Sequence, residues 1–344
     1  MYDLNDAIFG KISLLNIWFF ITEKCNLSCD YCFFRRRAKE RTISIAQISH
    51  LLKKLPPNRR YDFVISGGEP LLCWHLVKKT IELMRKIHPN SEITLQTNMF
   101  FLSENKACFL QKKDVVIEPG LDGGFISNFR HRIGFTESSF RKCVDKLSLI
   151  VKNRLRMNPT MTVHPQEVEL MFTNFKKLIS LGLNSIEVHP AFLADWRKTE
   201  TGEFIRQYKR ILEYEKSLGK NLVSKEYSFY IKNFSLDLVI QPDGFVLPNW
   251  TYLAFPYKLR RNFFIMKLSG DGIMVSRDKL RSYLRESKII FRKRITYRDF
   301  SNYNASLILN FTHDKALKER FLVYKYLCNN IQALDQLFIK RSSL

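Results

Sequence analysis

The chain has 344 residues, of which 45% are hydrophobic, and a formal net charge of +23. This composition is enough to bury the core of one barrel-sized domain with an appendage, or of two domains. The apolar run Ile12–Ile21 is interrupted by Ser13 and Asn16 and is too short to span a bilayer. Asp3 and Asp6 occupy the place of a basic n-region, which argues against a secretory signal peptide.

Seven cysteines stand at positions 25, 29, 32, 73, 108, 143 and 328. Their spacing shows no disulfide framework of the kind found in small secreted domains. We therefore expect a reducing compartment and a cytoplasmic location.

Positive charge is concentrated in Lys258–Arg298, where 13 Lys and Arg stand against 3 Asp and Glu. Such a field attracts an acidic peptide, nucleic acid or an anionic membrane surface. The alternative is a solvated basic surface with no specific partner. No RNA-binding signature with ordered aromatic residues is visible, so nucleic acid is supported by charge alone.

Strands and helices are predicted to alternate from about residue 12 to residue 220. The predicted strands are Ser13–Thr22, Asp62–Ser66, Glu92–Thr97, Val115–Gly120, Arg156–Val163 and Ser185–His189. The predicted helices between and after them are Ile45–Leu55, Trp74–His88, Ser103–Gln111, Ser138–Asn153, Glu167–Leu181 and Gly202–Leu218. This alternation predicts an α/β fold of parallel strands with right-handed crossovers, whose functional groups lie at the C-terminal ends of the strands.

The pattern changes beyond residue 220. Leu236–Ile240 and Gly244–Pro248 flank a Pro-Asp-Gly turn signal and predict a small hairpin. A helical extension is predicted at Arg277–Ser287, Tyr297–Leu309 and His313–Phe338. We therefore expect one unit over residues 1–220 and a second over residues 221–344.

Cys25, Cys29 and Cys32 form a C-x3-C-x2-C pattern directly after the first predicted strand. Three thiolates at this spacing hold one face of a [4Fe–4S] cluster, which usually takes four cysteine ligands. One iron is then left open for a ligand that is not protein. A structural zinc site is the alternative, but it closes with four ligands, usually as two separated pairs, and no second pair is present.

Gly67-Gly68-Glu69-Pro70 follows the second predicted strand. The cysteine triplet followed by this motif resembles the radical S-adenosylmethionine (AdoMet, or SAM) enzymes. The resemblance implies a partial (β/α)6 barrel, one [4Fe–4S] cluster on the three cysteines, and AdoMet on the open iron. One electron from the cluster then cleaves AdoMet to methionine and a 5′-deoxyadenosyl radical. An electron donor such as flavodoxin or ferredoxin is the implied partner.

The same resemblance places AdoMet contacts along the chain. Gly67, Gly68, Glu69 and Pro70 match the site of the AdoMet amino group, where glycine lets backbone approach a ligand closely.

Two further segments of this kind lie beside the cysteines and at the end of the third strand. Tyr31 and Phe33 flank the last cysteine, where an aromatic lies near adenine in this family, and ordinary packing is the alternative. Thr97 and Asn98 resemble a strand end that faces AdoMet, and a simple turn at Asn98 is the alternative.

Glu118-Pro119-Gly120-Leu121-Asp122-Gly123 resembles the S-L-D-G segment of the peptide-modifying SPASM/Twitch subgroup. Gly120 departs from the serine of that subgroup and removes one hydroxyl contact to AdoMet. Asp122 and Arg132 are the matching AdoMet-site residues, with Arg130 as a competing candidate for the arginine.

The last barrel strands end in further candidates. Met161 and Val188 are expected to border adenine. Glu187 and His189 either face substrate or are satisfied core groups, and Cys73 is either a hydrogen donor or an inert buried thiol.

The hairpin around Asp243 resembles the start of a SPASM or Twitch domain, where a cysteine normally follows. Asn249 stands at that position, and Cys328 is the only cysteine after Cys143. Because a second cluster needs several thiolates, we expect a SPASM-like region without auxiliary clusters.

These features favour a radical AdoMet enzyme that abstracts hydrogen from a peptide or protein, such as the precursor of a ribosomal peptide. A substrate of small-molecule or nucleotide type is the alternative. A non-catalytic iron–sulfur sensor is disfavoured, because a sensor has no need of an AdoMet amino-group site.

Overall fold

The computed structural model describes residues 16–32, 40–57, 59–191, 194–223, 230–231, 238–248, 260–276, 278–279 and 295–296. Its α-helices are α1 (Ile45–Lys54), α2 (Trp74–Ile87), α3 (Glu104–Lys112), α4 (Phe125–His131), α5 (Glu137–Lys152), α6 (Met171–Ser180) and α7 (Lys198–Leu218). Short 3-10 turns are η2 (Pro70–Cys73), η3 (Pro165–Leu170) and η6 (Arg261–Phe263). The strands are β1 (Asn16–Thr22), β2 (Ser28–Cys29), β3 (Asp62–Gly67), β4 (Glu92–Thr97), β5 (Val116–Pro119), β6 (Arg132–Ile133), β7 (Thr160–Val163), β8 (Glu187–Pro190), β9 (Tyr230–Ile231), β10 (Leu238–Ile240), β11 (Phe245–Leu247), β12 (Met266–Leu268), β13 (Ile273–Val275) and β14 (Ile295–Thr296).

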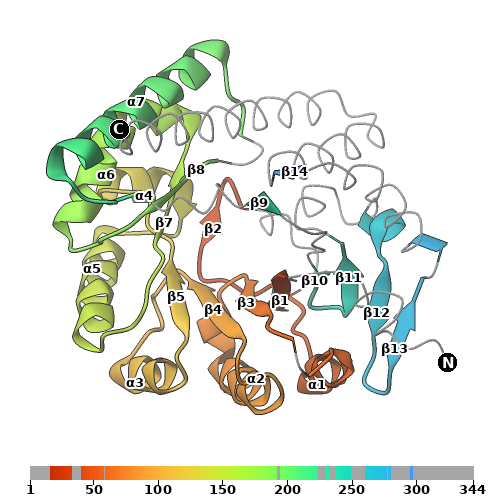
Figure 1. Cartoon of the computed structure of the whole chain (residues 1–344). Coiled ribbons are helices and arrows are strands. Elements are labelled where there is room, and N and C mark those ends of the chain that lie inside the picture. Colours follow the sequence, from red (N-terminus) through yellow and green to blue (C-terminus); the bar gives the residue numbers. More distant parts are fainter. Residues whose placement is uncertain are drawn as a thin grey trace.

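One curved sheet organises the described fold, in the order β13-β12-β11-β10-β1-β3-β4-β5. The strands from β10 through β1, β3 and β4 to β5 pair in parallel. β7 and β8 pair with each other, and parallel bridges from Ile117 to Met157 and from Gly120 to Thr160 connect this segment to β5. Helices α1, α2 and α3 lie along the outside of the sheet, and α5, α6 and α7 continue around it beyond β5 (Figure 1). The predicted α/β class with parallel strands is confirmed.

Side chains of the central strands alternate between the helix-covered face and an inner face, as strand geometry requires. In β1, Ile17, Phe19 and Ile21 are completely buried and belong to the main hydrophobic core. Trp18 and Phe20 project to the inner face and stack with ring centroids 6.4 Å apart. The hydrophobic core therefore lies between the sheet and the helices. The opposite, inner face of the sheet is left for a functional site.

Local signals fix several helix ends. Ser44 caps α1, because its Oγ accepts the amide of Gln47 over 3.2 Å while the Gln47 side chain accepts the Ser44 amide over 2.9 Å. Gly219 ends α7 in the left-handed conformation with φ of 60°. Helix α7 begins earlier than the predicted Gly202, because the Glu200 carboxylate accepts the amide of Arg197 and starts the helix there.

The structure adds elements that the sequence did not predict, namely α4, the two-stranded ribbon β2–β6, and the strands β12 and β13 beyond the predicted hairpin. The predicted helices Tyr297–Leu309 and His313–Phe338 lie outside the described residues, as does most of Arg277–Ser287. The division at residue 220 stays a prediction, although β10 pairs directly with β1 across it.

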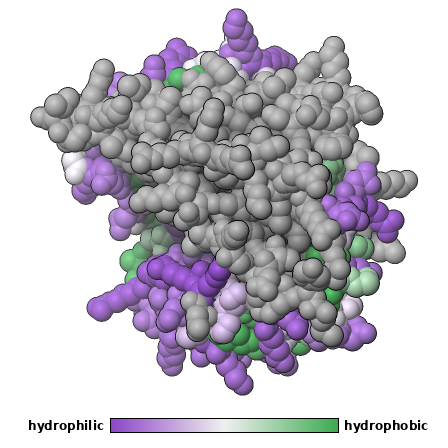
Figure 2. Space-filling view, turned by 45° about the vertical axis from the view of Figure 1, so that its right-hand side comes forward, coloured by the Kyte–Doolittle hydropathy of each residue, from purple (hydrophilic) through white to green (hydrophobic). Residues whose placement is uncertain are grey.

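Within the described ranges, no helix has the length and apolar character needed to cross a membrane. Figure 2 shows hydrophilic residues over much of the described surface on the face it presents, with hydrophobic residues gathered in smaller groups.

Candidate active site

The three candidate cluster ligands lie in the loop that follows β1. Cys29 is in β2, and the amide of Cys32 donates to the Cys29 carbonyl over 3.2 Å. The amide of Leu27 donates to Sγ of Cys25 over 3.4 Å. All three thiols are partly buried, and Cys29 is electrostatically coupled to both others, so the loop gathers them.

Burial raises the pKa of the Cys29 thiol to about 12, and the nearby Arg132 guanidinium opposes this only in part. Such a thiol stays protonated at neutral pH in the absence of a bound cation. Ligation by iron supplies the missing positive charge and releases the proton. A clustered trio of thiols, one of them strongly desolvated, fits a [4Fe–4S] cluster.

Glycine brings the end of β3 against this loop. The amide of Gly68 donates to the Thr22 carbonyl and the amide of Glu69 to the Lys24 carbonyl, both over 2.7 Å. A Cβ atom at Gly68 would lie 2.1 Å from the Lys24 carbonyl oxygen. Gly67 has φ of 130°, which side chains rarely tolerate. The contact between β3 and the cysteine loop therefore requires glycine.

The Glu69 carboxylate is completely buried and organises the end of β4. It accepts the Thr97 hydroxyl and the Asn98 amide, each over 2.8 Å, and the Leu71 amide over 2.9 Å. Burial raises its pKa, and these hydrogen bonds oppose the rise. In this structure the Glu69 carboxylate holds the end of β4 and the start of η2 in place, and Pro70 is the first residue of η2. Contact of the Gly-Gly-Glu-Pro motif with AdoMet stays a prediction.

Asn98 forms a turn with its own side chain and also contacts the cysteine loop. Its Oδ1 accepts the Phe100 amide over 3.1 Å, as in a turn. Its Nδ2 donates to Oδ1 of Asn26 over 2.9 Å and lies 3.9 Å from Sγ of Cys25. Asn98 therefore connects β4 to the cysteine loop.

Asp122 and Arg132 form a buried two-point ion pair, with both N–O distances at 2.8 Å. The Tyr31 hydroxyl donates to the same carboxylate over 2.5 Å, and burial raises the pKa of Tyr31 well above its usual range. Arg130 is exposed instead and pairs with Glu167. Arg132 is thus the arginine beside Asp122, and Tyr31 ties the cysteine loop to this pair.

The neighbouring side chain of Arg132 explains why position 120 is a glycine. A Cβ atom there would lie 3.3 Å from the guanidinium of Arg132. Glycine leaves room for the arginine, whereas a serine side chain would crowd it.

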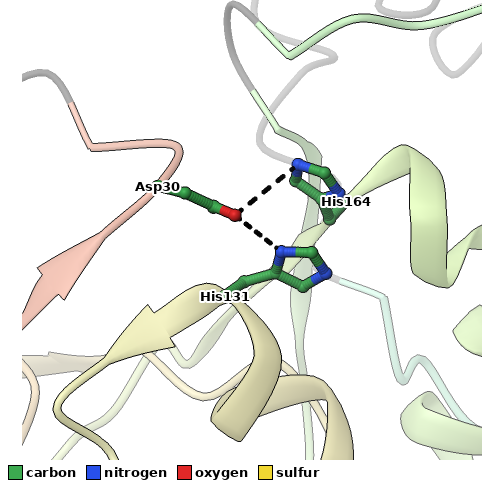
Figure 3. A group of neighbouring side chains, drawn as sticks. All are labelled: Asp30, His131 and His164. Atoms are coloured by element: carbon green, nitrogen blue, oxygen red, sulfur yellow. Dashed lines mark hydrogen bonds and ion pairs between the residues drawn. The ribbon is translucent and has the colours of Figure 1, made fainter.

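Asp30, His131 and His164 form a group that the sequence did not suggest (Figure 3). Nδ1 of His131 donates to the Asp30 carboxylate over 2.8 Å, and Nε2 of His164 lies 4.0 Å from the same oxygen. The two imidazoles stack 3.8 Å apart at 22°. Nearly parallel rings at this spacing do not aim their in-plane lone pairs at one ion, so the geometry favours hydrogen bonding over metal binding. The group joins the cysteine loop to β7.

Polar side chains line the inner face at the C-terminal ends of the strands. The Ser66 hydroxyl donates to Gln96 over 2.6 Å, and Gln96 Nε2 donates to Glu118 over 2.7 Å. Across the barrel, Nε2 of His189 lies 3.1 Å from the Glu187 carboxylate, and His189 lowers the pKa of Glu187. These carboxylates and the imidazole can orient a substrate or move a proton.

The remaining sequence candidates lie elsewhere. Met161 and Val188 are buried in the main core on the opposite face of their strands, so their contact with adenine stays a prediction. Cys73 is half-buried at the start of α2. The buried Cys143 lies nearer to the site, with Sγ 3.7 Å from the Asn98 carbonyl oxygen. Phe33 lies outside the described residues.

Residues 19–179 match the family model of the radical SAM superfamily. These residues form a radical SAM domain. The protein is therefore an enzyme, and its cofactors are a [4Fe–4S] cluster and AdoMet. A radical SAM relative, the cysteine-type anaerobic sulfatase-maturating enzyme of Clostridium perfringens, is 31% identical over 111 residues, 29% of this chain and 30% of that enzyme.

Solved radical SAM structures share the fold. The structure of anSMEcpe with bound AdoMet superposes with a TM-score of 0.68 at 15% identity, covering 96% of each chain. SuiB of Streptococcus suis, bound to its precursor peptide SuiA, gives a TM-score of 0.56 at 14% identity, covering 73% of this chain and 62% of SuiB.

Proposed function

We propose that this radical SAM enzyme modifies a peptide or protein, and that Cys25, Cys29 and Cys32 hold its [4Fe–4S] cluster. When bound, the cluster and AdoMet supply a 5′-deoxyadenosyl radical that takes a hydrogen atom from the substrate. The structural neighbour SuiB binds a precursor peptide, which supports the same substrate class here.

The observation that carries the peptide proposal is a pocket of about 430 Å³ outside the barrel. Adjacent strands set Phe245, Lys267 and Met274 in one row across β11, β12 and β13. The ring of Phe264 stacks on Phe245 with centroids 4.4 Å apart. Phe245, Phe264 and Met274 give the pocket an apolar lining at the edge of the described sheet.

The charges around this pocket are of one sign. Arg261, Lys267 and Lys279 line it, and no acidic residue does so among the described residues. An apolar pocket with three cations matches a peptide segment that carries both hydrophobic and acidic side chains. A small molecule held inside the barrel has no need of such a surface. The residue to be modified would then reach the inner face near Glu118 and Glu187.

The test incubates reduced enzyme and AdoMet with a library of synthetic peptides that carry both hydrophobic and acidic side chains, and follows peptide modification by mass spectrometry. The double variant Lys267→Glu/Lys279→Glu is expected to lower peptide modification at least about tenfold, because each reversal replaces attraction with repulsion. AdoMet cleavage without peptide should stay unchanged. Wild-type affinity for the peptide should fall as salt rises through about 0.1–0.2 M, where exposed charges are screened.

Lys152→Glu is the matched control, since Lys152 is exposed on α5, far along the chain from the pocket. Equal peptide turnover by the double variant and the wild type would reject the pocket as a peptide site. It would favour a small substrate held within the barrel.

A further inference from the structure

Strand β13 forms one end of the eight-stranded sheet, at the right-hand side of Figure 1. Among the described residues it pairs only with β12. Its middle residue, Met274, is 65% exposed. A Cβ atom at Gly270 or Gly272, in the turn before the strand, would meet nothing within 4 Å. Such an open strand edge is a template on which a further strand can pair.

Two hydrogen bonds on either side of β13 show which of its residues bond to β12. The amide of Ser276 donates to the Ile265 carbonyl, and the amide of Ser269 donates to the Gly272 carbonyl, both over 2.9 Å. In an antiparallel pair, the hydrogen-bonded positions recur at every second residue. Position 274 lies midway between 272 and 276, so the backbone of Met274 also faces β12.

The other two residues of β13 present their backbone to the open edge. The amides and carbonyls of Ile273 and Val275 point away from β12, because these residues alternate with Met274 along the strand. Each of the two offers one donor and one acceptor. A peptide that adds to a sheet edge is held by backbone groups of this kind.

The two faces of β13 differ in character. Ile273 and Val275 pack against the main hydrophobic core. Met274 instead continues the row of Phe245 and Lys267 that borders the pocket. Because side chains alternate along a strand, an added strand would place every second side chain beside the pocket and the others beside Ile273 and Val275.

The pocket face carries local positive charge. Nζ of Lys267 lies 5.0 Å from the centre of the Phe245 ring, and Nζ of Lys279 donates to the Arg261 carbonyl over 3.1 Å. Neither lysine has a carboxylate partner among the described residues. An acidic side chain beside the pocket would be attracted, whereas a basic one would be repelled. The local charge therefore selects an acidic peptide as the occupant of this edge.

We propose that the β13 edge binds the substrate peptide as an added β-strand, in a segment where acidic residues alternate with β-branched apolar ones. The proposal rests on the proposed function, which assigns the pocket to a peptide, and adds the conformation and residue pattern of that peptide. Acidic side chains lie over the pocket, and β-branched side chains extend the apolar face of Ile273 and Val275. Backbone hydrogen bonds supply affinity, and the alternate side chains supply selectivity.

The first test changes the peptide and uses the full, cluster-loaded chain. The probe is a short labelled peptide in which glutamate and valine alternate, and binding is followed by fluorescence anisotropy. A peptide of the same composition with the residues in two blocks should bind at least about fivefold more weakly, because it places acidic side chains on both faces. N-methylation of one alternate set of amides in the probe should weaken binding at least about tenfold, whereas N-methylation of the other set should leave it within about twofold, since only one set faces β13.

The second test changes the strand. Val275→Pro removes an outward amide and leaves the bonds to β12, because proline is tolerated on an edge strand where the N–H would face solvent. It should weaken binding of the alternating peptide at least about threefold, as expected for one lost hydrogen bond. Iron content and circular dichroism should match wild type. Val275→Thr is the matched control, because it keeps the amide and the branched shape, and it should bind within about twofold of wild type.

Equal binding of the two N-methylated peptides, or of the alternating and block peptides, would overturn strand addition. If Val275→Pro lowers the iron content, the N-methylated peptides decide the question without it. Loss of peptide turnover in Lys267→Glu/Lys279→Glu, with the two N-methylated peptides bound equally, would keep the proposed function and reject only the added strand. Unequal binding of these peptides, with no peptide modified, would keep the edge as a peptide site and reject the proposed function. A dimeric wild type that Val275→Pro converts to a monomer, with the N-methylated peptides bound equally, would assign the edge to a second copy of this chain.

Discussion

At the scale of single residues, Cys29 occupies a constrained position in the cysteine loop. It lies in β2 opposite Arg132, and burial raises its pKa to about 12. A thiol in such surroundings gains its thiolate character from a bound metal rather than from solvent.

We therefore expect Cys29→Ala to lose the cluster and to abolish AdoMet cleavage, because two thiols do not hold the cube. Anaerobic iron and sulfide analysis should give about four of each for wild type, as one [4Fe–4S] cluster requires, and far less for the variant. An iron content near twice that value in wild type, of which about half survives replacement of all three cysteines by alanine, would reveal a second cluster and contradict this assignment.

His88 provides a pH-dependent contribution to stability. It is 1% exposed, its Nε2 donates to the Leu52 carbonyl over 2.9 Å, and burial lowers its pKa below the usual value. The folded protein holds it neutral, whereas the unfolded chain binds a proton below about pH 6.5. The free energy of unfolding should therefore fall as pH drops from about 6.5 toward the lowered pKa of the folded state.

His88→Gln keeps a side-chain donor but does not titrate. The apparent melting temperature of reconstituted wild type should drop more between pH 7.5 and 5.5 than that of His88→Gln. Parallel pH curves for the two proteins would show that His88 does not titrate in this range.

Residue types and spacing were enough to predict the cysteine loop and the Gly-Gly-Glu-Pro turn, because both motifs are local in sequence. Long-range groups were not predictable in this way. Asp30, His131 and His164 come from three separate segments, and only folding brings their polar atoms within 4.8 Å of one another. The sequence likewise did not show whether Arg130 or Arg132 pairs with Asp122. The structure shows that the buried Arg132 does so, whereas Arg130 is exposed and pairs with Glu167.

At the scale of elements, strong alternation made β1, β3 and β4 predictable within a few residues. Helix α4 was missed because its pattern is inverted, with serine and asparagine inside and isoleucine and phenylalanine outside. A periodicity argument assumes that the apolar side faces the core. The ribbon β2–β6 was missed because two-residue strands carry no periodic signal.

The junction of β3 with the cysteine loop gives a prediction at this scale. Gly68→Ala forces the Lys24 carbonyl away from a Cβ atom that would otherwise lie 2.1 Å from it. Displacing the loop by about an ångström should lower the rate of AdoMet cleavage by about tenfold to a hundredfold.

Gly202→Ala is the control for this substitution. Nothing lies within 4 Å of a Cβ atom at Gly202, which sits in α7. It should keep full activity and stabilise the protein by about 0.5–1 kcal/mol, since alanine is the better helix residue. Wild-type cleavage rates in Gly68→Ala, measured by 5′-deoxyadenosine release, would show that the loop tolerates the shift.

At the scale of the whole molecule, the C-terminal hairpin supports the cysteine loop as well as the sheet. Asp243 in its turn pairs with Arg41 over 2.8 Å, and Arg41 pairs with Glu23 over 2.7 Å, two residues before Cys25. The Pro-Asp-Gly signal was read from the sequence as a turn, and its long-range ion pair was not foreseeable from local pattern.

This connection has a consequence for how the protein is made. Asp243 lies 202 residues beyond Arg41, and the ribosome adds roughly 5–20 residues per second. The cysteine loop therefore leaves the ribosome roughly 10–40 s before the hairpin that braces it. During that interval one edge of β1 has no β10 to pair with, and an open edge invites pairing with other chains. The cysteine loop is therefore braced for iron–sulfur loading only after the hairpin around Asp243 has been made.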